Sequence, residues 1–209
     1  ISLAFYSKLK NLECFIWLNR KTYITELLKE LGAKVVVKKI TLKNLYLKSD
    51  EFFKKNKILS ANPGATEEKL DANRRITAEI LRKKIKNQCI VSSVNNGSHI
   101  LGLSKNLKNP IFYGVYTKSK LAKSINSFAL TEIKKRNKYK TLNLIKANDK
   151  EVIKGFHLLS KEGLFLDGSS SAIIGSLNQI KHKNICCVLS GAALNNLTEV
   201  QKIISKMKN

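Results

Sequence analysis

The chain has 209 residues, 43% of them hydrophobic, and a formal net charge of +24. This hydrophobic content can bury one substantial core or two modest ones, which excludes a disordered chain. No run of about 18 apolar residues occurs, so we expect no membrane span. Residues 1–4 lack the basic region and small-residue cleavage site of a signal peptide, and they begin inside an apolar pattern, which indicates the interior of a longer polypeptide.

The positive charge is spread along the whole chain. Nearly all basic residues are lysine, with arginine only at positions 20, 74, 75, 82 and 136. Specific base readout favours arginine, and single-strand binding favours aromatics interleaved with charges; the sequence has neither pattern. We therefore interpret the charge as solvated helix and strand ends and expect no specific nucleic-acid partner. Salt-dependent, non-specific binding to duplex DNA is a distant alternative.

The cysteines Cys14, Cys89, Cys186 and Cys187 lie in apolar, strand-like runs. None has the C-x-x-C spacing or nearby histidine pair of a zinc site, so we expect no metal. We interpret them as small core residues with free thiols, which suits a reducing cytoplasm.

Short β-branched runs alternate with longer amphipathic stretches, a pattern typical of parallel strands joined by crossover helices. The predicted strands are residues 13–18, 34–39, 89–94, 111–116, 141–146 and 185–189. The predicted helices are residues 22–31, 42–55, 67–86, 149–161 and 197–207, with two more ending near residues 107 and 181. The fold class is therefore α/β: open, mostly parallel sheets with helices on both faces.

A turn at residues 62–64 is the best candidate for a domain boundary, because Asn, Pro and Gly follow one another there. We predict a smaller, mobile α/β domain at residues 1–60 and a larger one at residues 61–209, both incomplete.

Three predicted strands run into small polar residues just before a helix. The strand at 89–94 is followed by Asn95-Asn96-Gly97-Ser98-His99, a short strand ending near residue 166 by residues 167–171, and the strand at 185–189 by Ser190-Gly191. Such a junction directs backbone N–H groups and the positive end of the helix dipole at one point, which suits phosphate. Taken alone, the first junction is better explained as an ordinary turn. Three junctions at one sheet edge favour a ligand site.

These segments resemble the fold type II pyridoxal-phosphate enzymes, whose fold is that of tryptophan synthase β, and within them the threonine synthase branch. Residues 93–102 resemble that family's P-V-G-N-G-[GS]-x-L-x-G phosphate cup, and residues 161–170 its E-G-I-F-x-E-P-S block. Residues 188–191 are similar to its V-L-T-G. Asn62-Pro63 followed by residues 71–80 resembles its N-P segment and the E-G-Q-K-T-x-x-x-E-I that follows. The resemblance covers nearly the whole chain.

The resemblance implies a set of cofactor contacts. Backbone amides around Asn95, Asn96, Gly97, Ser98 and His99 would hold the phosphate of pyridoxal phosphate. Ser190 would face the pyridine nitrogen, and a neutral hydroxyl there leaves the ring unprotonated, which suits elimination and replacement chemistry.

The sequence departs from the family pattern at several positions. Asn95 stands for Gly, Gly168 for Pro, Ala72 for Gly and Arg75 for Thr, so we expect an altered cup and entrance. Residue 1 aligns just after the family's S-G-N-x-x substrate loop, and the Schiff-base lysine lies upstream of that loop. We therefore assign no catalytic residue within the chain.

The resemblance implies a threonine synthase-like lyase that converts O-phosphohomoserine to threonine and phosphate, present as a fragment without its catalytic lysine. It also makes a homodimer an expectation. One alternative is a threonine or serine dehydratase-like enzyme. Another is a non-catalytic remnant that binds a phosphorylated ligand or a partner subunit.

Overall fold

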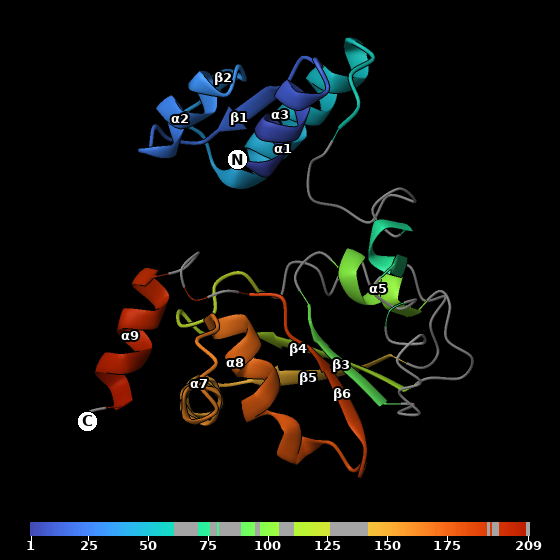
Figure 1. Cartoon of the computed structure of the whole chain (residues 1–209), viewed down its shortest axis with the longest axis vertical. Coiled ribbons are helices and arrows are strands. Elements are labelled where there is room, and N and C mark those ends of the chain that lie inside the picture. Colours follow the sequence, from blue (N-terminus) through green and yellow to red (C-terminus); the bar gives the residue numbers. More distant parts are fainter. Residues whose placement is uncertain are drawn as a thin grey trace. The chain divides into compact units, whose positions relative to one another are not determined.

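The computed structural model describes residues 1–60, 71–75, 79, 89–94, 97–104, 111–125, 142–191, 193 and 197–207. The chain divides into unit 1, Ile1–Pro63, and unit 2, Gly64–Asn209, whose elements are labelled in Figure 1. The predicted turn at residues 62–64 and most of the predicted helix at 67–86 lie outside the described residues, although residues 71–75 are helical.

Unit 1 contains a parallel pair of strands packed against helices. Its elements in chain order are α1 (Ser2–Leu9), β1 (Phe15–Leu18), α2 (Ile24–Glu30), β2 (Lys34–Val37) and α3 (Leu42–Lys55). The strands pair from Phe15 with Lys34 to Leu18 with Val37. Gly32 has a φ of 82°, the left-handed conformation that commonly follows the last turn of a helix, so it ends α2.

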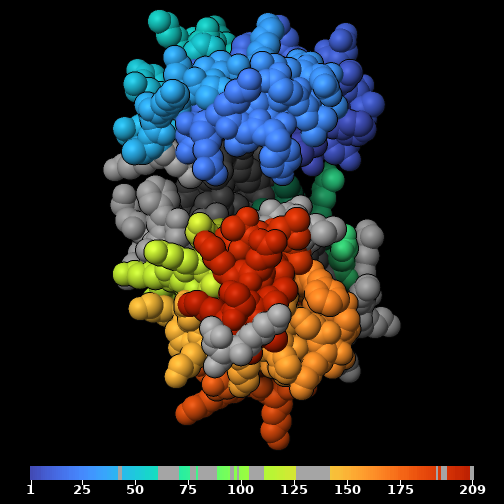
Figure 2. Space-filling view, turned by 90° about the vertical axis from the view of Figure 1, so that its left-hand side faces the viewer, coloured from blue at the N-terminus to red at the C-terminus, as the bar shows by residue number. Residues whose placement is uncertain are grey.

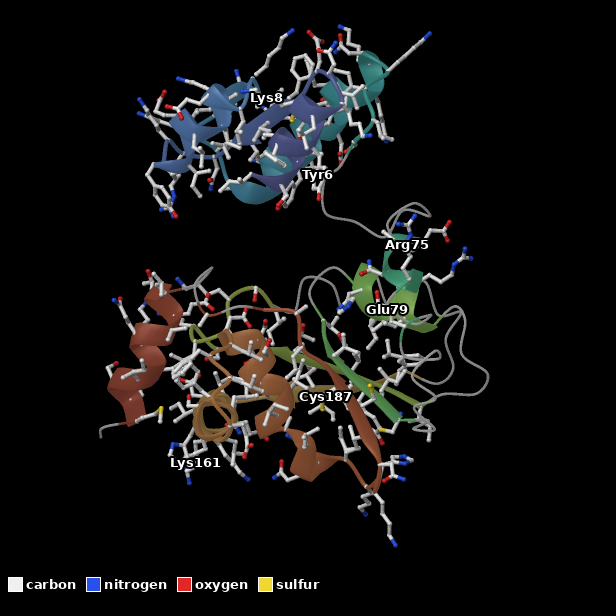
Figure 3. All side chains as sticks on the ribbon, in the orientation of Figure 1. Tyr6, Lys8, Arg75, Glu79, Lys161 and Cys187 are labelled. Atoms are coloured by element: carbon white, nitrogen blue, oxygen red, sulfur yellow. The ribbon has the colours of Figure 1, made fainter. Side chains whose placement is uncertain are left out.

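Side chains of the helices tie unit 1 together. Lys8, labelled on α1 in Figure 3, donates from Nζ to the carbonyl of Glu30 at 3.2 Å. This places a cation at the carboxyl end of α2, where the helix dipole favours positive charge. The Trp17 ring of β1 lies 5.4 Å from that of Phe52 on α3, measured between centroids. An aromatic cluster therefore fastens α3 to the sheet.

A hollow of about 650 Å³ runs beside β1 in unit 1. Phe15, Ile16 and Trp17 all contribute to its wall, together with residues of α1 and the end of α3. Consecutive side chains point to opposite faces of a strand. A hollow bordered by three consecutive residues therefore lies along the edge of the strand and not over one face. This edge of unit 1 is apolar.

Unit 2 is built on a parallel sheet in the order β5-β4-β3-β6. Its strands are β3 (Cys89–Ser93), β4 (Ile111–Thr117), β5 (Leu142–Ala147) and β6 (Ile185–Val188). The described helices are α5 (Ser98–Ser104), α7 (Asp149–Lys161), α8 (Gly168–Gly175), the 3-10 turn η1 (Leu177–Gln179) and α9 (Leu197–Met207). Residues 89–92 of β3 are all buried, as expected for a central strand covered on both faces.

The two faces of this sheet have separate cores. On one face, α5 packs Ile100 and Leu103 against Ile90 and Phe112. On the other, α7, α8 and α9 form a larger core that includes Val91, Val115, Val152, Phe156, Ile173 and Ile203. Figure 1 shows α5 and the group of α7, α8 and α9 on opposite sides of the sheet. The predicted fold class, an open parallel α/β sheet with helices on both faces, is confirmed.

The helices on the second face are held by capping and by an ion pair. The Asn148 side chain accepts from the Glu151 N–H at 3.1 Å, and the Glu151 carboxylate accepts from the Asn148 N–H at 2.7 Å, so a capping box begins α7. Lys206 of α9 reaches Asp149 at 2.7 Å, and this contact lowers the pKa of the Asp149 carboxyl. Figure 2 shows α9, in red, beside the orange segment that contains α7 and α8.

Two predicted elements differ in the structure. The strand expected to end near residue 166 is not one of the strands of the sheet. Leu166 forms only an isolated bridge. The helix expected to end near residue 181 is divided into α8 and η1, with Ser176 between them. Among the described residues, no helix is both long and apolar enough to cross a membrane.

Helices α7 and α8 approach each other through glycine. A Cβ added at Gly155 would lie 1.8 Å from the Ser171 carbonyl oxygen, and one added at Gly175 would lie 1.8 Å from the Glu151 carbonyl oxygen. Both obstacles are backbone atoms, which cannot rotate away as a flexible side chain does. The position of α8 therefore depends on the absence of side chains at these two residues.

We expect Gly155→Ala to destabilise unit 2 by about 2 kcal/mol or more, because the overlap outweighs the gain of about 1 kcal/mol that alanine normally gives inside a helix. Hydrogen–deuterium exchange of peptides covering residues 142–191 measures this change in unit 2 alone. Lys154→Ala, an exposed position on the same helix, is the matched control. Equal exchange in the two variants would contradict the close backbone packing.

Candidate functional site

Strands β3 and β6 are neighbours and end at the same edge of the sheet. They pair in parallel from Cys89 with Ile185 to Ser92 with Val188. Beyond these last pairs the chain continues to Val94 after β3 and to Ser190 after β6. The predicted phosphate turn and the predicted partner of the pyridine nitrogen therefore follow two neighbouring strands that end at the same edge.

The turn between β3 and α5 leads directly into the first turn of a helix. Gly97 has a φ of 79°, which favours glycine. The first hydrogen bond of α5 runs from the Leu101 N–H to the Gly97 carbonyl at 3.0 Å. The N–H groups of residues 98–100 therefore precede the first bond of the helix, and such N–H groups commonly bind anions. Asn95 and Asn96, predicted for the same turn, lie outside the described residues, as does the side chain of Ser98.

The His99 side chain is directed at β3. Its Nδ1 lies 3.1 Å from the Ser92 hydroxyl, and burial lowers the pKa of the imidazole. A neutral ring hydrogen-bonded to Ser92 supplies no positive charge to a phosphate. What His99 offers to the turn is its backbone N–H.

Ser190 is exposed at the end of β6, and the residue after it is held firmly. The Gly191 N–H donates to the Ser170 hydroxyl at 3.2 Å, and the Asp167 N–H donates to the Gly191 carbonyl at 3.1 Å. The loop that carries Ser190 is thus attached to the start of α8. The Ser190 side chain itself is exposed at this edge.

Asp167 and Ser170 were not among the predicted site residues. Asp167 is 3% exposed and caps α8, accepting from the Ser170 N–H at 3.0 Å and from the Ser169 hydroxyl at 2.6 Å. An acidic residue before a run of small hydroxyl residues is a recognisable helix-start pattern. That pattern predicts the cap but gives no sign of its contact with Gly191.

The departure from the family pattern at Gly168 has a structural counterpart. A Cβ there would lie 1.8 Å from the carbonyl oxygen of Leu121, which is buried. The loop at residues 118–125 therefore occupies the space that a proline ring would need. Of the other departures, Ala72 and Arg75 are exposed on the helical segment at residues 71–75 (Figure 3).

The cysteines of this sheet supply no nucleophile. Burial, with Cys186 and Cys89 nearby, raises the pKa of the Cys187 thiol to about 11, and burial also raises the pKa of the other two thiols. Figure 3 labels Cys187 on β6. Thiols with raised pKa values stay protonated and unreactive near neutral pH. Within the described part of the chain, no three His, Cys, Asp or Glu residues are grouped to bind a metal.

A comparison with known proteins identifies the family to which this chain belongs. The family model described as pyridoxal-phosphate dependent enzyme matches residues 1–191. This match covers most of the chain, so the chain belongs to the family of pyridoxal-phosphate dependent enzymes. Pyridoxal phosphate is the cofactor of that family, and the fold is that of its fold type II members.

Solved structures show the same fold at low sequence identity. The processed form of threonine deaminase isoform 2 from Solanum lycopersicum matches with a TM-score of 0.75 and 14% identity, over 97% of this chain and 65% of that one. Maize serine racemase matches with a TM-score of 0.71 and 12% identity, over 98% and 74%. Serine racemase from Dictyostelium discoideum matches with a TM-score of 0.70 and 14% identity, over 91% and 72%.

The chain is shorter than these relatives and spans 65% of the tomato enzyme. No curated protein sequence matches it.

The His99 imidazole makes the stability of unit 2 depend on pH. Its folded pKa is lowered below the ordinary value of 6.5, so the unfolded chain binds the proton more readily. The stabilisation is therefore present above pH 6.5 and is lost as the pH falls below it. We expect His99→Gln to flatten this acid-side loss, measured by hydrogen–deuterium exchange of peptides covering residues 89–104 at pH 8 and pH 5.5.

The exposed His157 provides the control, because His157→Gln should retain the pH dependence of the unaltered protein. If both substitutions gave the same profile, burial of the His99 imidazole would not be the source of the pH dependence.

Proposed function

We propose that this chain binds pyridoxal phosphate with the phosphate at the turn between β3 and α5 and with Ser190 at the ring nitrogen. The observation that carries the proposal is the parallel register of β3 and β6, which brings the two places to one sheet edge. The strand order supports it. The chain leaves β3 toward β4 on one side, whereas β6 lies on the other side of β3. Ligands of open α/β sheets bind where the connections diverge in this way.

The residues at the turn suit a phosphate. Gly97 allows the backbone to reverse direction, and the N–H groups of residues 98–100 precede the first hydrogen bond of α5. Asn95 and Asn96 complete the proposed cup. We assign no charged side chain to it, because the His99 imidazole is bonded to Ser92.

Ser190 sets the electronic character of the proposed site. Bound pyridoxal phosphate supplies an electron sink for elimination and replacement at an amino acid. A serine hydroxyl is a neutral partner for the ring nitrogen and leaves it unprotonated, whereas a carboxylate would favour protonation. This arrangement suits elimination chemistry.

The proposed reaction is that of a threonine synthase-like lyase, in which O-phosphohomoserine and water give threonine and phosphate. The order of four sequence blocks, among them residues 93–102 and 161–170, supports this substrate. A dehydratase that converts threonine to 2-oxobutanoate and ammonia is the second candidate, favoured by the likeness of the fold to two enzymes named threonine deaminase.

We also propose that the Schiff-base lysine lies outside these 209 residues, so the chain by itself does not run the reaction. The coverage of only 65% of the tomato enzyme agrees with this proposal. A non-catalytic remnant that binds a phosphorylated ligand or a partner subunit is the remaining alternative. We further propose a cytoplasmic homodimer as the natural form.

The glycine at the turn tests the cofactor site. We expect Gly97→Ala to weaken the binding of pyridoxal phosphate about tenfold or more, because a residue other than glycine is strained at its φ of 79° by about 1–3 kcal/mol. The measurement is a titration followed by the fluorescence of the cofactor. Gly32→Ala is the matched control, since Gly32 has a φ of 82° in unit 1 and nothing within 4 Å of an added Cβ. Equal weakening by both substitutions would place the phosphate elsewhere.

The intact mass of the protein from its own cells, captured with an antibody against α9, tests the position of the lysine. We expect a species heavier than 23.5 kDa by on the order of 100 residues, with borohydride fixing the cofactor to a lysine in the additional part. A lysine labelled within residues 1–209 would contradict the proposal. A mass of 23.5 kDa with no labelled lysine would favour the non-catalytic remnant.

Activity assays of the same preparation distinguish the two candidate reactions. Release of phosphate from O-phosphohomoserine supports the synthase, and formation of 2-oxobutanoate from threonine supports the dehydratase.

A further inference from the structure

Asp167 and Gly191 are packed directly against each other at the carboxyl end of β6. A Cβ added at Gly191 would lie 2.0 Å from Asp167 Oδ1 and 2.3 Å from Oδ2, so no side chain fits there while the carboxylate stays in place. The backbones are joined as well. The Asp167 N–H donates to the Gly191 carbonyl at 3.1 Å, and the Ala193 N–H donates to the Phe165 carbonyl at 3.3 Å. These two bonds have the pattern of an antiparallel bridge.

The first turn of α8 strengthens this contact. The Ser170 hydroxyl accepts from the Gly191 N–H at 3.2 Å and lies 3.4 Å from the Gly191 carbonyl. The Ser171 hydroxyl donates to the Asp167 carbonyl at 2.8 Å. Since α8 is itself fixed against α7, the end of β6 is attached to a rigid part of unit 2.

A second buried carboxyl group, that of Glu199 in the first turn of α9, belongs to this environment. Glu199 is 8% exposed, and its Oε1 accepts from the Lys123 N–H at 3.2 Å. Its Oε2 is buried without a hydrogen-bond partner among the described residues. Burial raises the pKa of this carboxyl, and the charge of Asp167 raises it further. A buried carboxylate oxygen without a donor is unfavourable, and protonation relieves that cost.

We propose that Asp167 is the positioning residue for Ser190, and that Glu199 holds a proton in the same buried environment, which couples α9 to the ring-nitrogen end of the site. This inference rests on the proposed function, in which Ser190 faces that nitrogen. Asp167 positions Ser190 through its contacts with Gly191 and with the first turn of α8. Glu199 influences Ser190 only through its electrostatic effect on Asp167.

The charges around Glu199 explain how the coupling works. Asp167 lies before α8, Lys123 lies in the loop after β4, and Lys202 lies on α9; the two lysines oppose the effect of Asp167 on the pKa. While Glu199 is protonated, one negative charge is present, and the Ser169 and Ser170 donors satisfy it. When Glu199 ionises, its carboxylate and that of Asp167 repel each other. The backbone at residues 190–191 then loses part of its support.

The direction of the pH dependence follows from the raised pKa of Glu199. The folded state binds the proton more tightly than the unfolded chain, whose ordinary value is 4.5. Its stabilising contribution is therefore present below pH 4.5 and is lost as the pH rises through the folded pKa. Glu199→Gln keeps the shape of the side chain and removes the titration.

The first experiment needs no cofactor. Hydrogen–deuterium exchange of peptides covering residues 185–193 is followed from pH 5 to pH 8.5 and corrected for the intrinsic rate of amide exchange. We expect protection in the unaltered protein to fall about fivefold to tenfold across this range, and to stay level in Glu199→Gln. Glu162→Gln, an exposed position in the same unit, should behave like the unaltered protein. An unchanged pH profile in Glu199→Gln would overturn the role of Glu199.

Substitutions of Asp167 separate positioning from general stability. Asp167→Ala should lower protection at residues 185–193 about tenfold or more at every pH, while peptides covering β4 and β5 keep theirs. Asp167→Asn retains an oxygen acceptor and should restore most of the protection. Uniform loss across unit 2 in Asp167→Ala, without rescue by Asp167→Asn, would make Asp167 a merely structural residue and overturn its positioning role.

The second experiment repeats the pH series with added pyridoxal phosphate and follows its binding. We expect the difference in affinity between the unaltered protein and Glu199→Gln to widen as the pH rises, in parallel with the exchange data. Binding that is identical in the two proteins would overturn the coupling to the site. If no variant bound the cofactor while exchange followed the expected pattern, the proposed function would fail and the action of the carboxyl pair on residues 190–191 would stand.

Discussion

The parallel pairing of β3 with β6 brings together two segments that are far apart in the sequence, because β4 and β5 are formed between them on the other side of β3. Closing such a long connection costs conformational entropy. Burial of β3 on both faces offsets that cost, since Ile90 packs against the α5 side and Val91 against the side of α7, α8 and α9. Everything proposed for the cofactor depends on this one strand pair, because the turn after Val94 and Ser190 follow strands that end at the same sheet edge.

Close backbone contacts then fix the elements around that edge. Gly155 and Gly175 let α7 and α8 touch, Gly168 accommodates the Leu121 carbonyl, and Gly191 accommodates the Asp167 carboxylate. In each case the space that a side chain would fill is already occupied by protein atoms. A rigid α8 is what makes its capping residue a useful anchor, because a cap on a loosely packed helix would move with it. Glycine in this unit therefore serves packing as much as chain reversal.

The environment behind Ser190 is more polar than an ordinary core. Asp167, Ser169, Ser170 and Glu199 are all buried there, and most of their polar atoms are hydrogen-bonded within the unit. Buried polar groups cost free energy unless they are paired, and a network of this kind is easily destabilised by the loss of one member. At this sheet edge, such a network gives a defined position to the loop that carries Ser190.

The sequence by itself determined the fold class, the family and most of the elements. The bounds of α3, α7 and α9 coincide with the prediction, because apolar periodicity is a local signal. The alternation of strands and helices in the sequence also indicated which segments meet at the sheet edge. Only the tertiary structure decided what individual atoms contact. It directed His99 toward Ser92, left Leu166 outside the sheet, and set Asp167 against Gly191, because each of these contacts depends on where distant segments lie after packing.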